Sequence, residues 1–256
     1  MDIFILIAVS FGASWLTFFC GFGLGTMLTP IFYMLFKDLE LAIAATTVVH
    51  FLNNVFKFML MKKSVNWKVA IPFGLAAIPA AFIGAYLLTH FDDFTILSLQ
   101  LGGELLEIKA MNLIFGIVLS GFALIELIPT WSLAFSKQKL WIGGVISGFF
   151  GGLSGHQGAL RTAFLVKYKL EKNVFIATGI VVALTIDIVR SSVYFSDLSK
   201  VANINWRFVL ISLTAALFGA ISGRYFLQKI KLATLNIIVS IGMLIFGLAL
   251  GFGLLN

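Results

Sequence analysis

The chain alternates between long apolar runs and short polar or charged interruptions. Most runs have the roughly 17 to 25 residues that an α-helix needs to cross the hydrocarbon core of a bilayer. A helix satisfies its own backbone hydrogen bonds in lipid, so the pattern predicts a bundle of membrane-spanning helices. The apolar runs lie near residues 3–20, 26–36, 40–61, 67–89, 111–128, 139–153, 158–168, 172–195, 205–228 and 232–253.

Two of these runs are much shorter than the others. Residues 26–36 and 158–168 cover only about 16 Å at 1.5 Å per residue, which is about half a bilayer. Each follows a glycine-rich turn, at residues 21–25 and 151–155. Short segments of this kind are typical of the broken helices of transporters, so each is predicted to form a hairpin that enters and leaves by one side.

The two short runs occupy matching places in two halves of the chain. The triplet Val-Asn-Trp at 65–67 recurs as Ile-Asn-Trp at 204–206, and we interpret the chain as an internal duplication with repeats at 1–130 and 137–256. Five segments per repeat make the second repeat run opposite to the first. The predicted fold is an all-α polytopic membrane protein of two inverted repeats. Each repeat has a glycine-turn hairpin with one half-length helix, plus three spanning helices.

Composition excludes a soluble protein. The 256 residues are 60% hydrophobic and 11% charged, whereas soluble domains carry about a quarter charged residues. The net charge of +7 is assigned to loops that face anionic lipid, and no nucleic-acid partner is predicted. Cys20 is single and the histidines are scattered at 50, 90 and 156, so neither a metal site nor a cofactor is predicted.

Basic residues predict the orientation of the helices, because Lys and Arg concentrate in cytoplasmic loops. An outside N-terminus assigns ten of them to inner loops, namely Lys62, Lys63, Lys68, Lys137, Lys139, Lys167, Lys169, Lys172, Lys229 and Lys231. It assigns four to outer loops, namely Lys37, Lys109, Lys200 and Arg207. This asymmetry predicts that both termini lie outside, together with a polar outer loop at 90–110.

The glycine turns carry a resemblance to a known family. Residues 21–25 read Gly-Phe-Gly-Leu-Gly and lead into Thr29 and Pro30, and residues 151–161 read Gly-Gly-Leu-Ser-Gly-His-Gln-Gly-Ala-Leu-Arg. With the repeated Ala-Thr and Asn-Trp pairs, nearly the whole chain resembles the TauE/SafE sulfite exporter family, the toluene-sulfonate uptake permeases. The resemblance implies transport of sulfite, sulfonates or related anions across a bacterial inner membrane, with a small anion and membrane lipid as partners.

The chemistry of the turns also predicts an anion site. Glycine permits close backbone approach, and the start of a helix presents unsatisfied N–H groups and a partial positive charge. Arg161 adds a planar guanidinium suited to a sulfonate or carboxylate. The alternative is that the glycines serve close helix packing. The candidate anion-binding residues at the turns are Gly23, Gly25, Thr29, Gly155, His156, Gln157 and Arg161.

A polar stripe follows one face of the segment 40–61. It consists of Thr46, His50, Asn53, Asn54 and Lys57, spaced i, i+4, i+7, i+8 and i+11. At mid-membrane depth this face is predicted to point into the protein or a wet cavity. A role in substrate or proton binding and a role in helix–helix contact remain alternatives for His50 and the asparagines. Lys57 lies nearer the inner end and is predicted to extend to the interface.

The matching segment 172–195 carries polar residues on two faces. Thr178 and Thr185 lie on the face that corresponds to the stripe and are further candidate site residues. On the other face, Asp187 and Arg190 are three residues apart, and we predict a structural ion pair. Proton coupling through Asp187 is the alternative, with His50 and His156 as the other candidates for coupling.

Three functions compete for this pattern. No Walker-type nucleotide-binding sequence is present, so the leading prediction is a secondary transporter and not an enzyme. The second is an intramembrane serine hydrolase, because Gly152, Ser154 and Gly155 fit the G-x-S-G pattern. That reaction requires a histidine base within reach of the serine, and no histidine follows His156. The third is an anion channel. The two halves differ in sequence and each glycine turn opens to one side, and both features favour a closed, alternately accessible site over a continuous pore.

Overall fold

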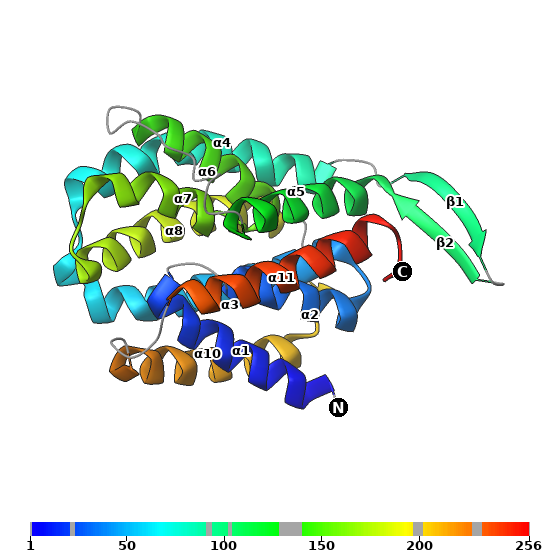
Figure 1. Ribbon diagram of the computed structural model, residues 1–256, viewed down its shortest axis with the longest axis horizontal. Helices are drawn as coiled ribbons and strands as arrows, with labels where there is room; N and C mark the ends of the chain where they lie inside the picture. Colours follow the sequence, from blue (N-terminus) through cyan, green and yellow to red (C-terminus); the bar gives the residue numbers. More distant parts are fainter. Residues whose placement is uncertain are drawn as a thin grey trace.

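The protein is a bundle of helices that run roughly along one long axis (Figure 1). The computed structural model describes residues 2–20, 24–90, 94–101, 104–127, 140–196, 202–226 and 232–255. The helices are α1 (Asp2–Cys20), α2 (Leu24–Phe36), α3 (Leu39–Met61), η1 (Lys62–Ser64), α4 (Trp67–His90), α5 (Ala110–Leu127), α6 (Leu140–Ser154), α7 (Gly158–Leu165), η4 (Val166–Tyr168), α8 (Lys172–Tyr194), α10 (Trp206–Phe226) and α11 (Leu232–Gly251). The two half-length runs of the sequence form the short helices α2 and α7.

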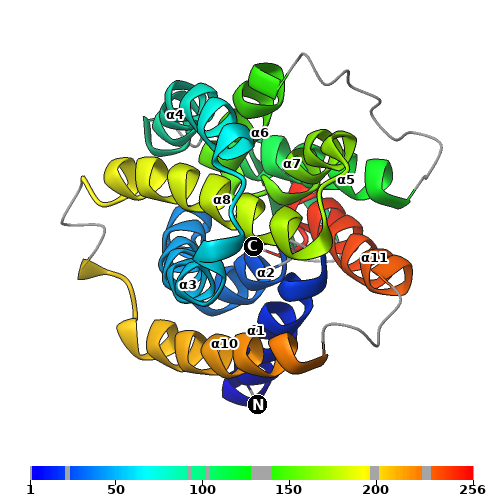
Figure 2. The same cartoon turned by 90° about the vertical axis from the view of Figure 1, so that its left-hand side faces the viewer.

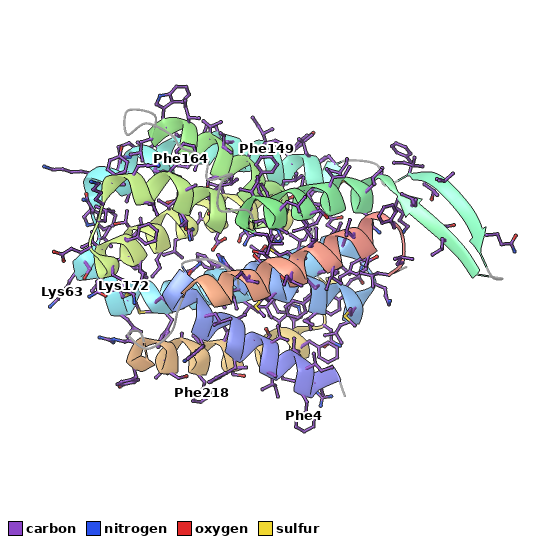
Figure 3. All side chains as sticks on the ribbon, viewed as in Figure 1. Phe4, Lys63, Phe149, Phe164, Lys172 and Phe218 are labelled. Atoms are coloured by element: carbon purple, nitrogen blue, oxygen red, sulfur yellow. The ribbon has the colours of Figure 1, made fainter. Side chains whose placement is uncertain are left out.

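Four helical segments are long and apolar enough to cross a membrane, within the described ranges. They are Leu39–Ser64, Trp67–His90, Lys172–Tyr194 and Trp206–Tyr225. Large apolar side chains cover the outside of the bundle, including Phe4 and Phe218, which are 82% and 66% exposed (Figure 3). An apolar exterior of this kind suits contact with lipid tails, and the prediction of a helical, multi-pass membrane protein is confirmed.

Glycines allow several helices to pack backbone against backbone. Gly148 of α6 lies so close to α4 that an added Cβ would approach the Ala77 carbonyl oxygen to 2.5 Å. A Cβ on Gly152, one turn further, would collide with the Ala81 carbonyl of α4. Small residues drive such close packing between membrane helices. The packing interpretation therefore holds for these α6 glycines, including Gly152 at the start of the second turn.

The two halves of the chain are interleaved. Helix α1 packs along α10, α4 packs along α6 and α5 packs along α11. Helices α3 and α8 contact each other in the middle, between the α4–α6 pair and the α1–α10 pair (Figure 2). Every one of these contacts joins a helix before residue 128 to a helix after residue 139, so the main interfaces lie between the halves.

The segment 90–110, expected as a polar loop, contains a β-hairpin. Strands β1 (Thr95–Leu101) and β2 (Glu104–Lys109) pair antiparallel, with Leu99 opposite Leu106. The hairpin extends beyond the helices at the end of the molecule where both described chain ends lie (Figure 1). The expected polar interruption thus contains two paired strands.

Candidate functional site

A buried polar cluster joins α3 to α8. The Asp187 carboxylate is fully buried, and its Oδ2 accepts a hydrogen bond of 2.7 Å from His50 Nδ1. Its Oδ1 accepts a 3.0 Å bond from Arg190 Nε and lies 2.9 Å from Arg190 Nη2. The ion pair expected from the three-residue spacing is therefore present. A single carboxylate connects an imidazole of the first half to a guanidinium of the second.

The polar stripe on α3 supplies the first half of this cluster. Asp38 fixes the start of α3, because its carboxylate accepts a 2.9 Å hydrogen bond from the Leu41 N–H at the N-cap position. From that start, the helical spacing directs the stripe inward, and all its members are buried. Asn54 Nδ2 lies 3.4 Å from Asp187 Oδ2 and adds a second donor from α3.

A water-sized cavity of about 20 Å³ lies beside the cluster. Its polar lining consists of His50, Asn54, Lys57, Arg161 and Thr162, and the remaining lining is apolar side chains and Gly179. No carboxylate is among the lining residues in the described part of the chain. Two basic side chains, Lys57 and Arg161, thus line the cavity, and α3, α7 and α8 form its walls.

Lys57 does not extend to the membrane interface as expected from the sequence. Its side chain is only 1% exposed, and Nζ donates a 3.3 Å hydrogen bond to the Ser14 carbonyl oxygen of α1. The helix continues past Lys57 to Met61 and then into η1, which leaves the lysine inside the bundle. Its spacing of eleven residues from Thr46 places it on the same helical face as the other stripe residues. The position of Lys57 on this face is the sequence feature that could have identified it as a site residue.

Arg161 lies in the first turn of α7, as expected, and is buried. Its guanidinium crosses to α8, where Nε would lie 3.3 Å from a Cβ added to Gly179. Glycine at position 179 thus leaves the space that the Arg161 side chain occupies. The structure brings Arg161, His50, Asn54 and the unexpected Lys57 together around one cavity.

Gly25, the last residue of the first glycine-rich segment, lies beside Gly155 near this cluster. Gly155 has a φ of +77°, a conformation that favours glycine, and an added Cβ would lie 2.5 Å from Arg190 Nη1. A Cβ on Gly25 would lie 3.5 Å from the Gly155 carbonyl oxygen. Thr29 Oγ1 donates to the Gly25 carbonyl at 2.9 Å and lies 3.3 Å from Thr46 Oγ1. Gly23 lies outside the described residues.

His156 and Gln157 are buried in the second turn but do not line the cavity. Gln157 Nε2 lies 3.5 Å from Asp187 Oδ1, at the edge of hydrogen-bond distance. The His156 ring packs edge to face on Phe115 of α5, with ring centroids 6.2 Å apart. Gln157 therefore lies on the Asp187 side of the cluster, and His156 lies against α5.

Three other candidates hold helices and loops together. The Thr178 hydroxyl accepts a 3.0 Å hydrogen bond from the Asn66 N–H, which fixes the loop before α4. Thr185 faces α4, where its Oγ1 would lie 3.3 Å from a Cβ added to Gly74. Asn53 Oδ1 accepts a 3.0 Å bond from Ser14 Oγ of α1. The structure places none of them in the cavity lining.

The Ser154 hydroxyl has partners that do not resemble a catalytic pair. It donates a 2.8 Å hydrogen bond to the Phe150 carbonyl and accepts a 3.4 Å bond from the His156 backbone N–H. No histidine ring is hydrogen-bonded to it among the described residues. Within the same part of the chain, no group of three metal-ligating side chains was found.

Comparison with models of known protein families gives a match over nearly the whole chain. The family model described as sulfite exporter TauE/SafE matches residues 6–250. No match was found among curated proteins or among solved structures. The match confirms the resemblance seen in the glycine turns, and because the family consists of transporters it also confirms the prediction that the protein is not an enzyme. The chain belongs to the TauE/SafE sulfite exporter family of membrane transporters for sulfite and related anions.

Proposed function

We propose that the protein is a secondary transporter of a small sulfur oxyanion, sulfite or a sulfonate, bound between the repeats in the cavity beside the glycine turns. The observation that carries this proposal is the position of Lys57 and Arg161 around one cavity without a described carboxylate in its lining. A cation at mid-membrane costs at least about 2.5 kcal/mol on insertion scales. Two cations around one cavity favour an anionic occupant, and a guanidinium matches the oxygens of an oxyanion.

The size of the cavity supports a carrier over a channel. A volume of about 20 Å³ is close to that of one water molecule and is smaller than a sulfonate needs. Binding therefore requires the walls to move apart, which is the expected behaviour of a site with alternating access. A channel would instead present a continuous pore.

The packing supports two inverted repeats at 1–130 and 137–256. In this assignment α1 to α5 correspond in order to α6, α7, α8, α10 and α11. The first helix of each repeat then packs on the fourth helix of the other, as α1 does on α10 and α6 does on α4. The third helices, α3 and α8, contact each other, as do the fifth helices, α5 and α11. These are the contacts that a two-fold axis between the repeats requires.

The protein is proposed to lie in a bacterial inner membrane with both termini outside. Lys63 and Lys172 lie at one end of the molecule, and the β-hairpin and both described chain ends lie at the other (Figures 1 and 3). An accumulation of lysines marks the cytoplasmic end of membrane helices. The hairpin is then on the outer side.

Cysteine labelling tests this topology. In a protein with Cys20 replaced by serine, Lys63→Cys and Ser98→Cys introduce single thiols at opposite ends. A membrane-impermeant maleimide applied to intact cells should label Ser98→Cys, and Lys63→Cys should react only after the membrane is opened. Labelling of Lys63→Cys in intact cells would contradict the orientation, and equal labelling of both would contradict the arrangement of the repeats.

Binding measured by calorimetry tests the proposed substrate. Purified protein should bind sulfite or a simple alkyl sulfonate saturably, and should bind acetate and choline more weakly or not at all. The comparison separates the sulfur oxyanion from carboxylates and from cations. Absence of binding to every sulfur oxyanion would contradict the proposed function.

Transport by the variant His50→Ala distinguishes a transport role of this side chain from a purely structural role. His50 lines the cavity and also holds Asp187, and imidazole is the side chain that changes charge near neutral pH. His50→Ala is expected to lower sulfite transport at least tenfold and to change its pH dependence while the protein remains inserted. His90→Ala, at the exposed end of α4, is the matched control. Loss of thermal stability with normal transport per folded molecule would assign His50 to helix contact alone.

A further inference from the structure

Arg190 has hydrogen-bonding capacity that Asp187 does not use. The side chain is fully buried, and its Nε and Nη2 face Asp187 Oδ1. Among the residues that the structure describes, its Nη1 has no hydrogen-bond partner. A charged donor left unsatisfied in the interior is unfavourable by more than the roughly 1 to 3 kcal/mol of a neutral group, so this position calls for an acceptor.

The Gly155 backbone lies directly against that donor, in the position that a side chain at 155 would otherwise fill. An added Cβ at position 155 would lie 2.5 Å from Arg190 Nη1, and φ is +77° there, so a side chain is excluded on both grounds. The next residue, His156, is only 4% exposed, and neither of its ring nitrogens has a hydrogen-bond partner within the described part of the chain. Two independent side chains thus bring unsatisfied polar atoms to one turn that immediately precedes α7.

This position is separate from the cavity that Lys57 and Arg161 line. Neither Gly155, His156 nor Arg190 contributes to the lining of that cavity. Asp187 lies between the two, because its Oδ2 holds His50 of the cavity and its Oδ1 holds Arg190. Within the described chain, the buried charges are three Lys or Arg side chains and one Asp. Because the buried cations outnumber the buried carboxylate, their charge can be balanced by more than one anionic group.

We propose a second anion subsite at the Gly155 turn, in which Arg190 Nη1 and the His156 ring bind a small oxyanion of the same class as the substrate. The inference rests on the proposed function. The Lys57–Arg161 cavity and this subsite form two successive positions, with the Asp187 carboxylate as the fixed charge between them. An anion at either position lies near a cation. The Asp187 carboxylate repels an anion from the space between the two positions.

Selenite is a suitable probe, because it has the shape and charge of sulfite and selenium scatters X-rays anomalously. Crystals of the whole protein soaked in selenite should show one selenium peak in the Lys57–Arg161 cavity and another beside Arg190 Nη1. His156→Leu should lose the second peak and retain the first. Arg190 is left unchanged in this test, because its removal would leave the buried Asp187 carboxylate without its counter-charge.

The possible results of the selenite soak test the second subsite and the transporter proposal separately. A peak in the Lys57–Arg161 cavity alone would overturn the second subsite and leave the transporter proposal intact. A second peak that persists in His156→Leu would overturn the contacts assigned here. No selenium at either position, together with no sulfite binding in solution, would overturn the proposed function as well.

Discussion

Replacing Arg161 by glutamine is expected to weaken sulfite binding about 100-fold, because a buried charged hydrogen-bond partner contributes about 2 to 5 kcal/mol. Arg161 reaches from α7 to α8 through the space left by Gly179 and lines the proposed anion cavity. Arg161→Lys retains the charge but loses the planar fork, so a loss of about tenfold is expected. Calorimetry on purified protein measures both.

The matched control is Arg207→Gln, which removes the same charge from the exposed start of α10. It should bind sulfite as the wild-type protein does. Thermal unfolding of each variant verifies that it is folded. Wild-type affinity in folded Arg161→Gln would exclude this residue as an anion ligand.

Replacing Asp187 by alanine is expected to destabilise the protein by about 3 to 5 kcal/mol, because it leaves buried partners without their counter-charge. Arg190 and His50 both contact this carboxylate, and Asp187 is the one acidic side chain among the buried residues that the structure describes. The expected result is a large loss of monodisperse protein on size-exclusion chromatography in detergent and a lower unfolding temperature.

A double replacement separates lost pairing from lost packing. Asp187→Asn with Arg190→Gln keeps the approximate shapes and polar groups but removes both charges. It should recover much of the folded protein that Asp187→Ala loses. Wild-type stability in Asp187→Ala, or no recovery in the double variant, would contradict the view that the buried charge of Asp187, paired with Arg190 within α8, stabilises the protein.

Much of the fold could be predicted because the information is local. Apolar runs of known length predict α3, α4, α8 and α10. Helical spacing alone placed the α3 stripe on one buried face, and the interval of three residues paired Asp187 with Arg190. Nothing local showed the hairpin at 95–109, because two short strands in a polar interruption stabilise each other only after pairing.

Contacts between the halves could not be predicted in the same way. His50 and Asp187 lie far apart in the sequence, and only the packing of α3 on α8 brings them to 2.7 Å. Lys57 is buried by contact with α1 and by the walls of the cavity that α7 and α8 complete, although its place near the end of the apolar run suggested exposure. Thr185 matched the stripe in spacing, yet the neighbour on its face is α4. Spacing identifies a shared face, and tertiary packing decides what that face contacts.

Sulfite flux into liposomes that contain the purified protein measures transport itself. Uptake should be saturable and exceed uptake by protein-free liposomes, should be largely lost with Arg161→Gln and should be retained with Arg207→Gln. Uptake no greater than in protein-free liposomes, or undiminished uptake with folded Arg161→Gln, would contradict the proposed function.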